Sequence, residues 1–161
     1  ADSETAKYRA DMLEKRDEED RWMRELYSHW SLQSDPKSVE MIDRRYIERL
    51  VGCVANECSP ANATDMKGRL NSVRNIMGMK FMEQRTLKNG GAIWVNGETN
   101  GKRAARIEEC LKVAEPRSMK MRIMLIPYRI GSPVLCMLSG MFIEWVRQVA
   151  PTMFAKMKAN R

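Results

Sequence analysis

The residue types that most often carry out catalysis or bind metals are few in this chain, and their spacing suits neither task. His29 is the only histidine, and it lies between Ser28 and Trp30 in an apolar stripe, where a packed or surface role is expected. Zinc sites are usually marked by Cys-x-x-Cys pairs. No such pair occurs among Cys53, Cys58, Cys110 and Cys136. The sequence therefore predicts no catalytic residue, no metal site and no cofactor.

A glycine-bearing turn followed by cations is the nearest approach to a phosphate site. Residues 97–103 read GETNGKR, whereas the phosphate loop of nucleotide hydrolases has four residues between its glycines and Ser or Thr after its Lys. Arg103 takes the place of that hydroxyl residue, which argues against a nucleotide hydrolase. The start of a helix with Lys102, Arg103 and Arg106 would still suit a phosphate, because free amides and cations converge there. The alternative is an ordinary turn whose bases are solvated.

Charge is distributed unevenly along the chain. There are 28 Lys and Arg residues against 21 Asp and Glu residues, for a net charge of +7. Residues 1–50 hold thirteen acids and ten bases, so the whole excess of bases lies in residues 51–161. Such asymmetry indicates contact with nucleic acid, a membrane surface or an acidic protein. A merely soluble basic surface is the alternative.

We predict that the later basic residues contact RNA through its phosphates, with little sequence preference. Trp94 and Tyr128 lie near these residues in the sequence and could stack on bases. No sequence motif of a known RNA-binding domain accompanies them. The predicted phosphate contacts are Lys102, Arg103, Arg106, Lys120, Arg122 and Arg129.

Apolar periodicity predicts a mainly α-helical, irregular chain of about five helices, with one short hairpin or extended segment near 92–101. Asp35-Pro36 is a typical helix start, since Asp caps the free amides and Pro suits the first turn. The segment 118–126 fits either a strand or a helix, and Pro127 should truncate it. The predicted helices cover residues 3–30, 36–58, 64–87, 102–114 and 133–149, with a kink or restart after Pro151.

The N-terminal helix is predicted to act as a separate arm. Residues 1–34 form this charged helical arm, and residues 35–161 form a basic helical domain. The arm ends in an aromatic stripe at three- and four-residue steps. We expect contact with a partner protein at Trp22, Leu26, Tyr27 and Trp30. Closure of the stripe over the chain's own core is the alternative.

Residues 130–143 contain no charge, but a membrane-spanning helix needs about twenty apolar residues. Small residues would let another helix approach closely: Gly131, Ser132, Cys136, Ser139 and Gly140. A buried central helix, contact with lipid or a membrane helix, and a partner groove all remain open. The acidic start of the chain lacks the apolar core of a signal peptide, so reduced thiols and an intracellular, organellar or viral setting are expected.

Two fragments resemble coat proteins of flexible filamentous plant RNA viruses. They are IWV at 93–95 followed by AEP at 114–116, and VRQVAP at 146–151. No residue role is carried over from this resemblance. The residues themselves predict a non-enzymatic basic subunit of a larger assembly, such as a ribonucleoprotein or nucleocapsid, that contacts RNA and other protein subunits. The alternative is an accessory structural subunit of an organellar membrane protein complex, with residues 130–143 contacting lipid or a membrane helix.

Overall fold

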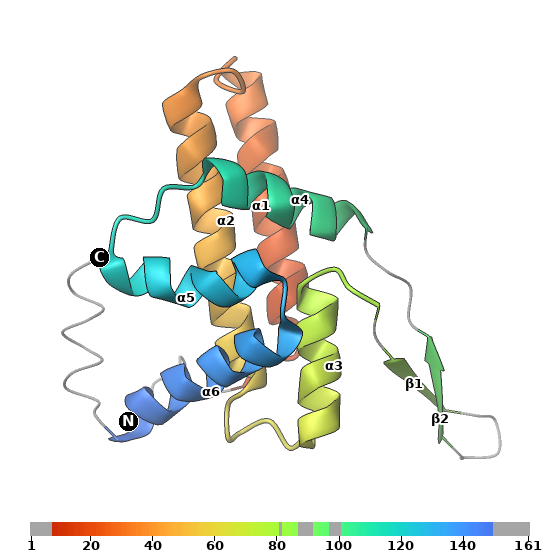
Figure 1. The fold of residues 1–161 in the computed structure, drawn as a ribbon. Helices are drawn as coiled ribbons and strands as arrows, with labels where there is room; N and C mark the ends of the chain where they lie inside the picture. Colours follow the sequence, from red (N-terminus) through yellow and green to blue (C-terminus); the bar gives the residue numbers. More distant parts are fainter. Residues whose placement is uncertain (1–7, 81, 87–91, 97–100, 150–161) are drawn as a thin grey trace, which may run out of the picture.

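The computed structural model describes residues 8–80, 82–86, 92–96 and 101–149, and this part of the chain is mainly α-helical, as predicted (Figure 1). A short antiparallel hairpin is formed by β1 (Met82–Thr86) and β2 (Ala92–Asn96). Side chains of the hairpin lie outside the described residues. The helices are α1 (Met12–His29), α2 (Pro36–Glu57), α3 (Met66–Ile76), α4 (Gly101–Val113), α5 (Met119–Ile130) and α6 (Pro133–Val149).

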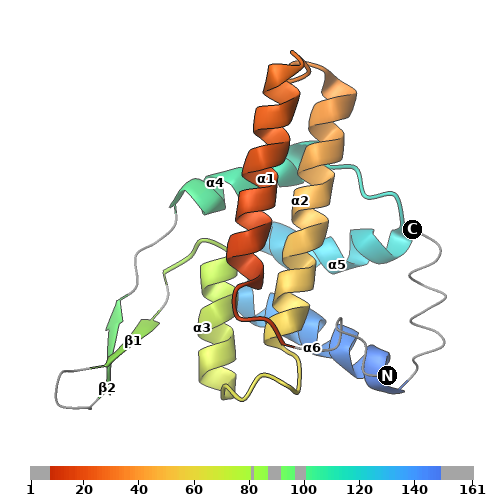
Figure 2. The same cartoon turned by 180° about the vertical axis from the view of Figure 1, so that it is seen from behind.

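The long helix α2 lies at the centre, and each of the other helices packs against it. Figures 1 and 2 show α1 running alongside α2, while α4, α5 and α6 cross the opposite side of α2. Ile47, Leu50 and Val54 are fully buried on α2 and form the middle of the core. The apolar side chains of α3, α5 and α6 close over them. The core therefore depends on contacts between distant parts of the chain.

The start of α2 follows the sequence prediction. Asp35 accepts a hydrogen bond from the Ser38 amide at 2.9 Å, and Pro36 takes the first position of the helix. Asp35 therefore satisfies a backbone N–H that has no partner within the helix. Similarly, Pro133 begins α6, as predicted, and the helix continues to Val149, its last described residue.

The predicted third helix is too long, and the hairpin has a different partner. Asp65, rather than Thr64, caps α3, and the helix ends at Ile76. Gly78 follows with a φ of 68°. Glycine is favoured in this left-handed conformation and commonly ends helices. The chain then forms β1, which pairs with β2, so the partner of residues 92–96 precedes them instead of following them.

Residues Met119–Ile130 form a helix, and Pro127 lies within it instead of ending it. Ser118 caps α5 by accepting a hydrogen bond from the Met121 amide at 3.2 Å. Gly131 ends the helix with a φ of 73° and turns the chain into α6. The helix thus has a defined start and end, and the alternation of Met119, Met121 and Ile123 that favoured a strand is incidental. Residues after Val149, including Pro151, lie outside the described residues.

Candidate interaction surfaces

Two of the predicted RNA-contacting arginines are used inside the protein. The Arg103 guanidinium contacts Asp17 at 2.6 Å and donates a hydrogen bond to the carbonyl oxygen of Asn75 at 2.8 Å. Arg106 contacts Asp20 at 3.1 Å and Asp43 at 2.7 Å. These contacts hold α4 to α1 and α2 and leave little of either guanidinium exposed. In this conformation neither Arg103 nor Arg106 can present its charge to an RNA phosphate.

The same contacts account for part of the charge asymmetry. Asp17 and Asp20 come from the acidic N-terminal helix, and their partners Arg103 and Arg106 lie 86 residues further along the chain. Tyr46 joins this cluster, because its hydroxyl donates to Asp17 at 2.9 Å. Acids of the early chain therefore neutralise bases of the later chain within one molecule.

The other predicted RNA-contacting residues lie in three different settings. Lys102, Arg122 and Arg129 are exposed, and Lys120 is half-buried. The Tyr128 ring is buried in the core, and its hydroxyl donates to the Leu50 carbonyl oxygen at 3.4 Å, so stacking on a base is excluded. The side chain of Trp94 lies outside the described residues.

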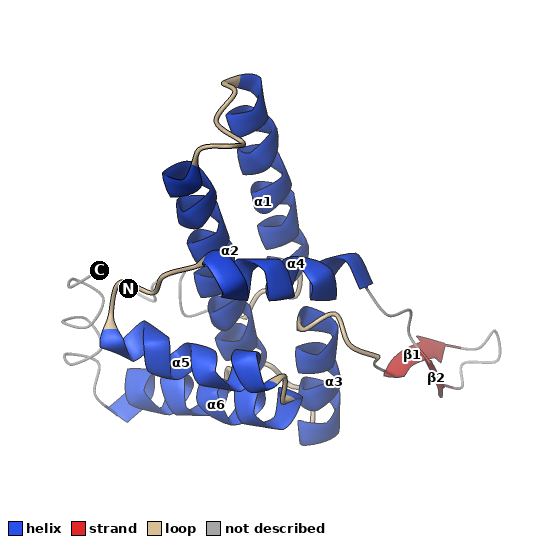
Figure 3. Ribbon diagram, turned by 45° about the horizontal axis from the view of Figure 1, so that its top comes forward, coloured by secondary structure: helices blue, strands red, loops and turns tan. Residues whose placement is uncertain are grey.

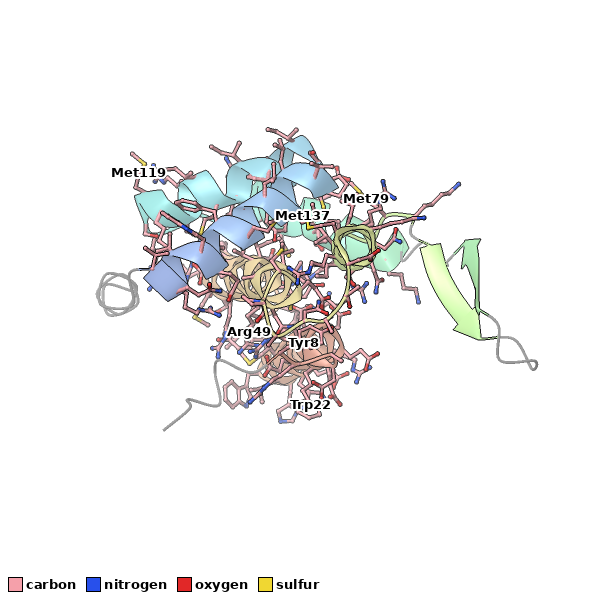
Figure 4. All side chains as sticks on the ribbon, turned by 90° about the horizontal axis from the view of Figure 1, so that it is seen from below. Tyr8, Trp22, Arg49, Met79, Met119 and Met137 are labelled. Carbon is pink, nitrogen blue, oxygen red and sulfur yellow. The ribbon has the colours of Figure 1, made fainter. Side chains whose placement is uncertain are left out.

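The aromatic stripe of α1 is on the surface. Trp22, Leu26 and Trp30 are exposed, and Tyr27 is half-buried. In Figure 4, Trp22 lies on the side of the molecule away from α5 and α6. The stripe therefore does not close over the core. However, α1 as a whole packs along α2 and is tied to α4 by the ion pairs of Asp17 and Asp20.

Helix α6 is apolar on two opposite faces. Its inner face, with Cys136, Met137, Gly140 and Ile143, is buried against the core. Gly140 is placed so close to α2 that an added Cβ would lie 3.0 Å from the Val54 carbonyl oxygen. The outer face is also apolar but exposed: Val134, Leu135, Leu138, Phe142, Trp145 and Val149. A helix with apolar side chains on two opposite faces is normally covered on both.

The neighbouring helix α5 adds a second exposed strip. Met121, Leu125 and Tyr128 face the core, and the opposite side carries Met119, Ile123, Ile126 and Ile130, all exposed. Helices α5 and α6 pack side by side (Figure 3). We call these two strips together the α5–α6 face: Met119, Ile123, Ile126, Ile130, Val134, Leu135, Leu138, Phe142, Trp145 and Val149.

The α5–α6 face is large for the surface of a single protein. Its ten side chains are each 40–73% exposed. That is on the order of 1,000 Å² of apolar area, because an aromatic side chain offers roughly 150–250 Å² and an aliphatic one somewhat less. The largest apolar patch of a typical monomer is about 300–600 Å². The Phe142 and Trp145 rings stack with their centroids 5.9 Å apart and form an aromatic centre on α6.

Charge borders the α5–α6 face on one helix only. Lys120, Arg122 and Arg129 lie on α5, next to the exposed strip in the helical sequence. On α6, the two charged residues of the helix pair with each other, Arg147 contacting Glu144 at 2.6 Å. Burial raises the pKa of the Glu144 carboxyl, although Arg147 opposes the shift.

All four cysteines are free and buried. Burial raises the pKa of Cys53 and of Cys136 to about 12 and that of Cys58 to about 11, and it raises the pKa of Cys110 as well. The thiolate is the reactive form of cysteine, so these thiols are poor nucleophiles in the folded protein. The part of the chain that the structure describes contains no cluster of three or more potential metal ligands.

Among the described helices, none is long and apolar enough to cross a membrane. Comparison with protein families, curated protein sequences and solved structures finds no match to this chain. The function must therefore be argued from the geometry of its own surfaces.

The uncharged stretch 130–143, for which the sequence leaves burial, membrane contact and a partner groove open, contains part of the α5–α6 face. The rest of the face was not predicted. The missed signal is a spacing of four, three and four residues from Met119 to Ile130, which is helical. A similar spacing continues on α6 from Leu135 to Val149. Because the inner face of α6 is apolar too, its outer strip could not be separated from the core in the sequence.

Proposed function

We propose that this chain is a non-enzymatic subunit of a larger protein assembly, and that the α5–α6 face is its docking surface. The observation that carries the proposal is the two-faced apolar character of α6. Its inner face is covered by the core, and its outer face is exposed over the whole helix. Removing apolar area from water is favourable by roughly 25 cal/mol per Å², so covering a face of this size would stabilise a complex. A protein partner would supply that cover.

The composition of the face suits a protein interface. Interface centres are poor in charge and rich in aromatic residues and Met, and the residues that contribute most to binding are often Trp. Phe142 and Trp145 provide such a centre, and the cations on α5 provide a polar rim. The exposed α1 stripe is a smaller, second contact for an assembly of this kind.

Co-purification tests the proposal. The full chain, expressed in its native cells, should elute in a complex with other copies or other polypeptides. Leu138→Glu combined with Phe142→Glu should release it from that complex. Met66→Glu is a matched control, because Met66 and Leu138 are both 50% exposed and Met66 lies on α3. Unchanged elution of the double variant would refute docking through this face.

RNA contact stays a prediction, now supported by fewer residues. Arg122 and Arg129 are exposed on one helix, where they could reach phosphates, whereas Arg103 and Arg106 are committed to internal ion pairs. RNA retention at low salt should fall on Arg122→Glu with Arg129→Glu, because each lost phosphate contact lowers the affinity and its salt dependence. Equal retention of the wild type and this variant would remove the prediction.

A further inference from the structure

We propose that the α5–α6 face is covered by the α5–α6 face of a second copy of this chain, with the two α6 helices packed against each other across a two-fold axis. This inference rests on the proposed function and names the partner. Two copies related by a two-fold axis present the same patch to each other, so the patch must be self-complementary. Spacing, charge and area on this face meet that requirement.

The outer strip of α6 has the spacing of a helix-packing seam. Residues 135, 138, 142, 145 and 149 are Leu, Leu, Phe, Trp and Val, separated by steps of three, four, three and four. This alternation keeps apolar side chains on one seam when two helices pack at a small angle. On α5, Met119, Ile123, Ile126 and Ile130 continue the pattern with steps of four, three and four. Two such helices from each copy would form a four-helix layer.

The residues that flank the α6 seam carry no charge. In a helix pair, the positions beside the seam decide which helices can approach, because like charges there repel each other. On α6 these positions are filled by Val134, Ser139, Met141, Val146 and Gln148. The α6 helices of two copies can therefore meet without bringing like charges together. The exposed cations Arg122 and Arg129 lie on α5, away from the α6 seam.

The area is sufficient for a stable dimer. Covering most of the face on both copies removes on the order of 2,000 Å² from water, and specific stable interfaces bury about 1,200–2,000 Å² in total.

The α1 stripe offers only Trp22, Leu26 and Trp30, too little to cover the ten side chains of the α5–α6 face. An anionic membrane surface would favour cations along both edges of the face, whereas the exposed cations Arg122 and Arg129 both lie on α5, and in the described part of α6 Arg147 contacts Glu144.

Mass measurement on the full chain in solution tests the inference. Sedimentation velocity should show a dimer of the wild type at micromolar concentration. Leu138→Glu with Phe142→Glu should weaken the dimer at least a hundredfold, while Met66→Glu and Trp22→Glu should leave it intact. Far-UV circular dichroism confirms that each variant is folded, and the substituted side chains are exposed in the single copy.

Cross-linking provides a second measurement that does not weaken the fold. Phe142 is the central residue of the seam, so Phe142→Cys places two copies of the new thiol near the axis. A short bis-maleimide should join them into a covalent dimer, and Met66→Cys should give none. The native cysteines do not interfere, because they are buried and their thiol pKa values are raised.

Three results would overturn the inference. The wild type could be monomeric at all concentrations, or it could be a monomer that floats with anionic phospholipid vesicles. Alternatively, Trp22→Glu could dissociate the dimer while Leu138→Glu with Phe142→Glu leaves it intact. A monomeric chain that still co-purifies with a different polypeptide through this face would refute self-association and leave the proposed function standing. A monomer that captures no partner would refute both.

Discussion

Arg106 is the residue whose role differs most between sequence and structure. Its guanidinium lies between Asp20 and Asp43 and 5.6 Å from the centre of the Tyr46 ring. Only 11% of its side chain is exposed. Buried charges are tolerated when they are paired. Without Arg106, Asp43 loses its ion pair at 2.7 Å, while Asp20 keeps its contact with Arg24 at 3.3 Å. This residue therefore stabilises the fold by holding together acids from two helices.

Replacing Arg106 should destabilise the protein strongly. In Arg106→Met, two carboxylates with little exposure lose their shared cation, and the free energy of unfolding should fall by about 3–5 kcal/mol. Urea denaturation monitored by circular dichroism measures it. Lys102→Met is the matched control on the same helix, and because Lys102 is exposed its effect should be within about 0.5 kcal/mol. A loss below about 1 kcal/mol in Arg106→Met would contradict this role.

The sequence could not separate Arg106 from the cations that remain on the surface. Arg103, Arg106, Arg122 and Arg129 all lie on amphipathic or partly apolar helices, among apolar neighbours in the sequence. What distinguishes the first two is contact with acids 86 residues earlier in the chain. Local spacing carries no information about such a contact. For the same reason Tyr128 was predicted at the surface, although it packs against α2.

Glu144 gives the protein a measurable pH dependence. Burial raises the pKa of its carboxyl in the folded state, so the folded protein keeps this proton at pH values where the unfolded chain has released it. The free energy of unfolding should therefore fall as pH rises. The fall begins at about pH 4.3, the ordinary pKa of glutamate, and ends above the raised pKa of Glu144 in the folded protein. Glu144→Gln removes the titration, so its unfolding free energy relative to wild type should increase over this range.

Urea denaturation at several pH values between 4 and 8 measures the effect. Glu108→Gln is a control of opposite sign. A hydrogen bond from Lys112 lowers the pKa of the exposed Glu108 carboxyl. The wild type therefore gains stability from Glu108 as pH rises, and the unfolding free energy of Glu108→Gln relative to the wild type should fall slightly. A pH-independent difference between Glu144→Gln and the wild type would show that Glu144 has the same pKa in both states.

At the scale of elements, α6 is fixed by its closest approach to α2. The absence of a side chain at Gly140 lets the backbones meet, as the small residues of 130–143 predicted. A Cβ at this position would lie 2.9 Å from the Val54 side chain and 3.0 Å from the Val54 carbonyl oxygen. The carbonyl oxygen belongs to the central helix and cannot move easily.

Gly140→Ala should therefore destabilise the protein by about 1–3 kcal/mol, as expected when a well-packed core receives extra volume. Thermal and urea denaturation measure the change. Gly101→Ala is the control, because nothing lies within 4 Å of a Cβ at Gly101, at the start of α4. That change should be neutral or slightly stabilising. Equal stability of the two variants would mean that α6 can shift away from α2.

Elements with clear local signals were predicted well, and elements that depend on one residue or on distant contacts were not. Asp35-Pro36 and Pro133 mark the starts of α2 and α6 in the sequence alone. The end of α3 depends on Gly78, which lies within an apolar helical pattern in the sequence and adopts a φ of 68°. In α5, alternating residues imitate a strand, and only capping by Ser118 and packing of Leu125 against the core settle the helix.

For the whole molecule, part of the charge asymmetry is neutralised within one copy. Ion pairs such as Asp17 to Arg103 join the acidic and basic parts of the chain within one copy. The surface then presents apolar area on two sides, as Trp22 and Met119 show in Figure 4. The α5–α6 face is the larger of the two exposed areas, so it should dominate association between molecules.

If two copies share this face, the melting temperature must depend on protein concentration. Unfolding of a dimer releases two chains, and dilution favours the unfolded state. A tenfold increase in protein concentration raises the free energy of unfolding by about 1.4 kcal/mol per dimer. For chains of this length, that raises the melting temperature by about 2 °C. Scanning calorimetry measures this shift at protein concentrations from about 5 to about 500 μM, which span roughly two decades. Leu138→Glu with Phe142→Glu should melt at one temperature throughout, and a wild type that does the same would exclude a dimer that forms on folding.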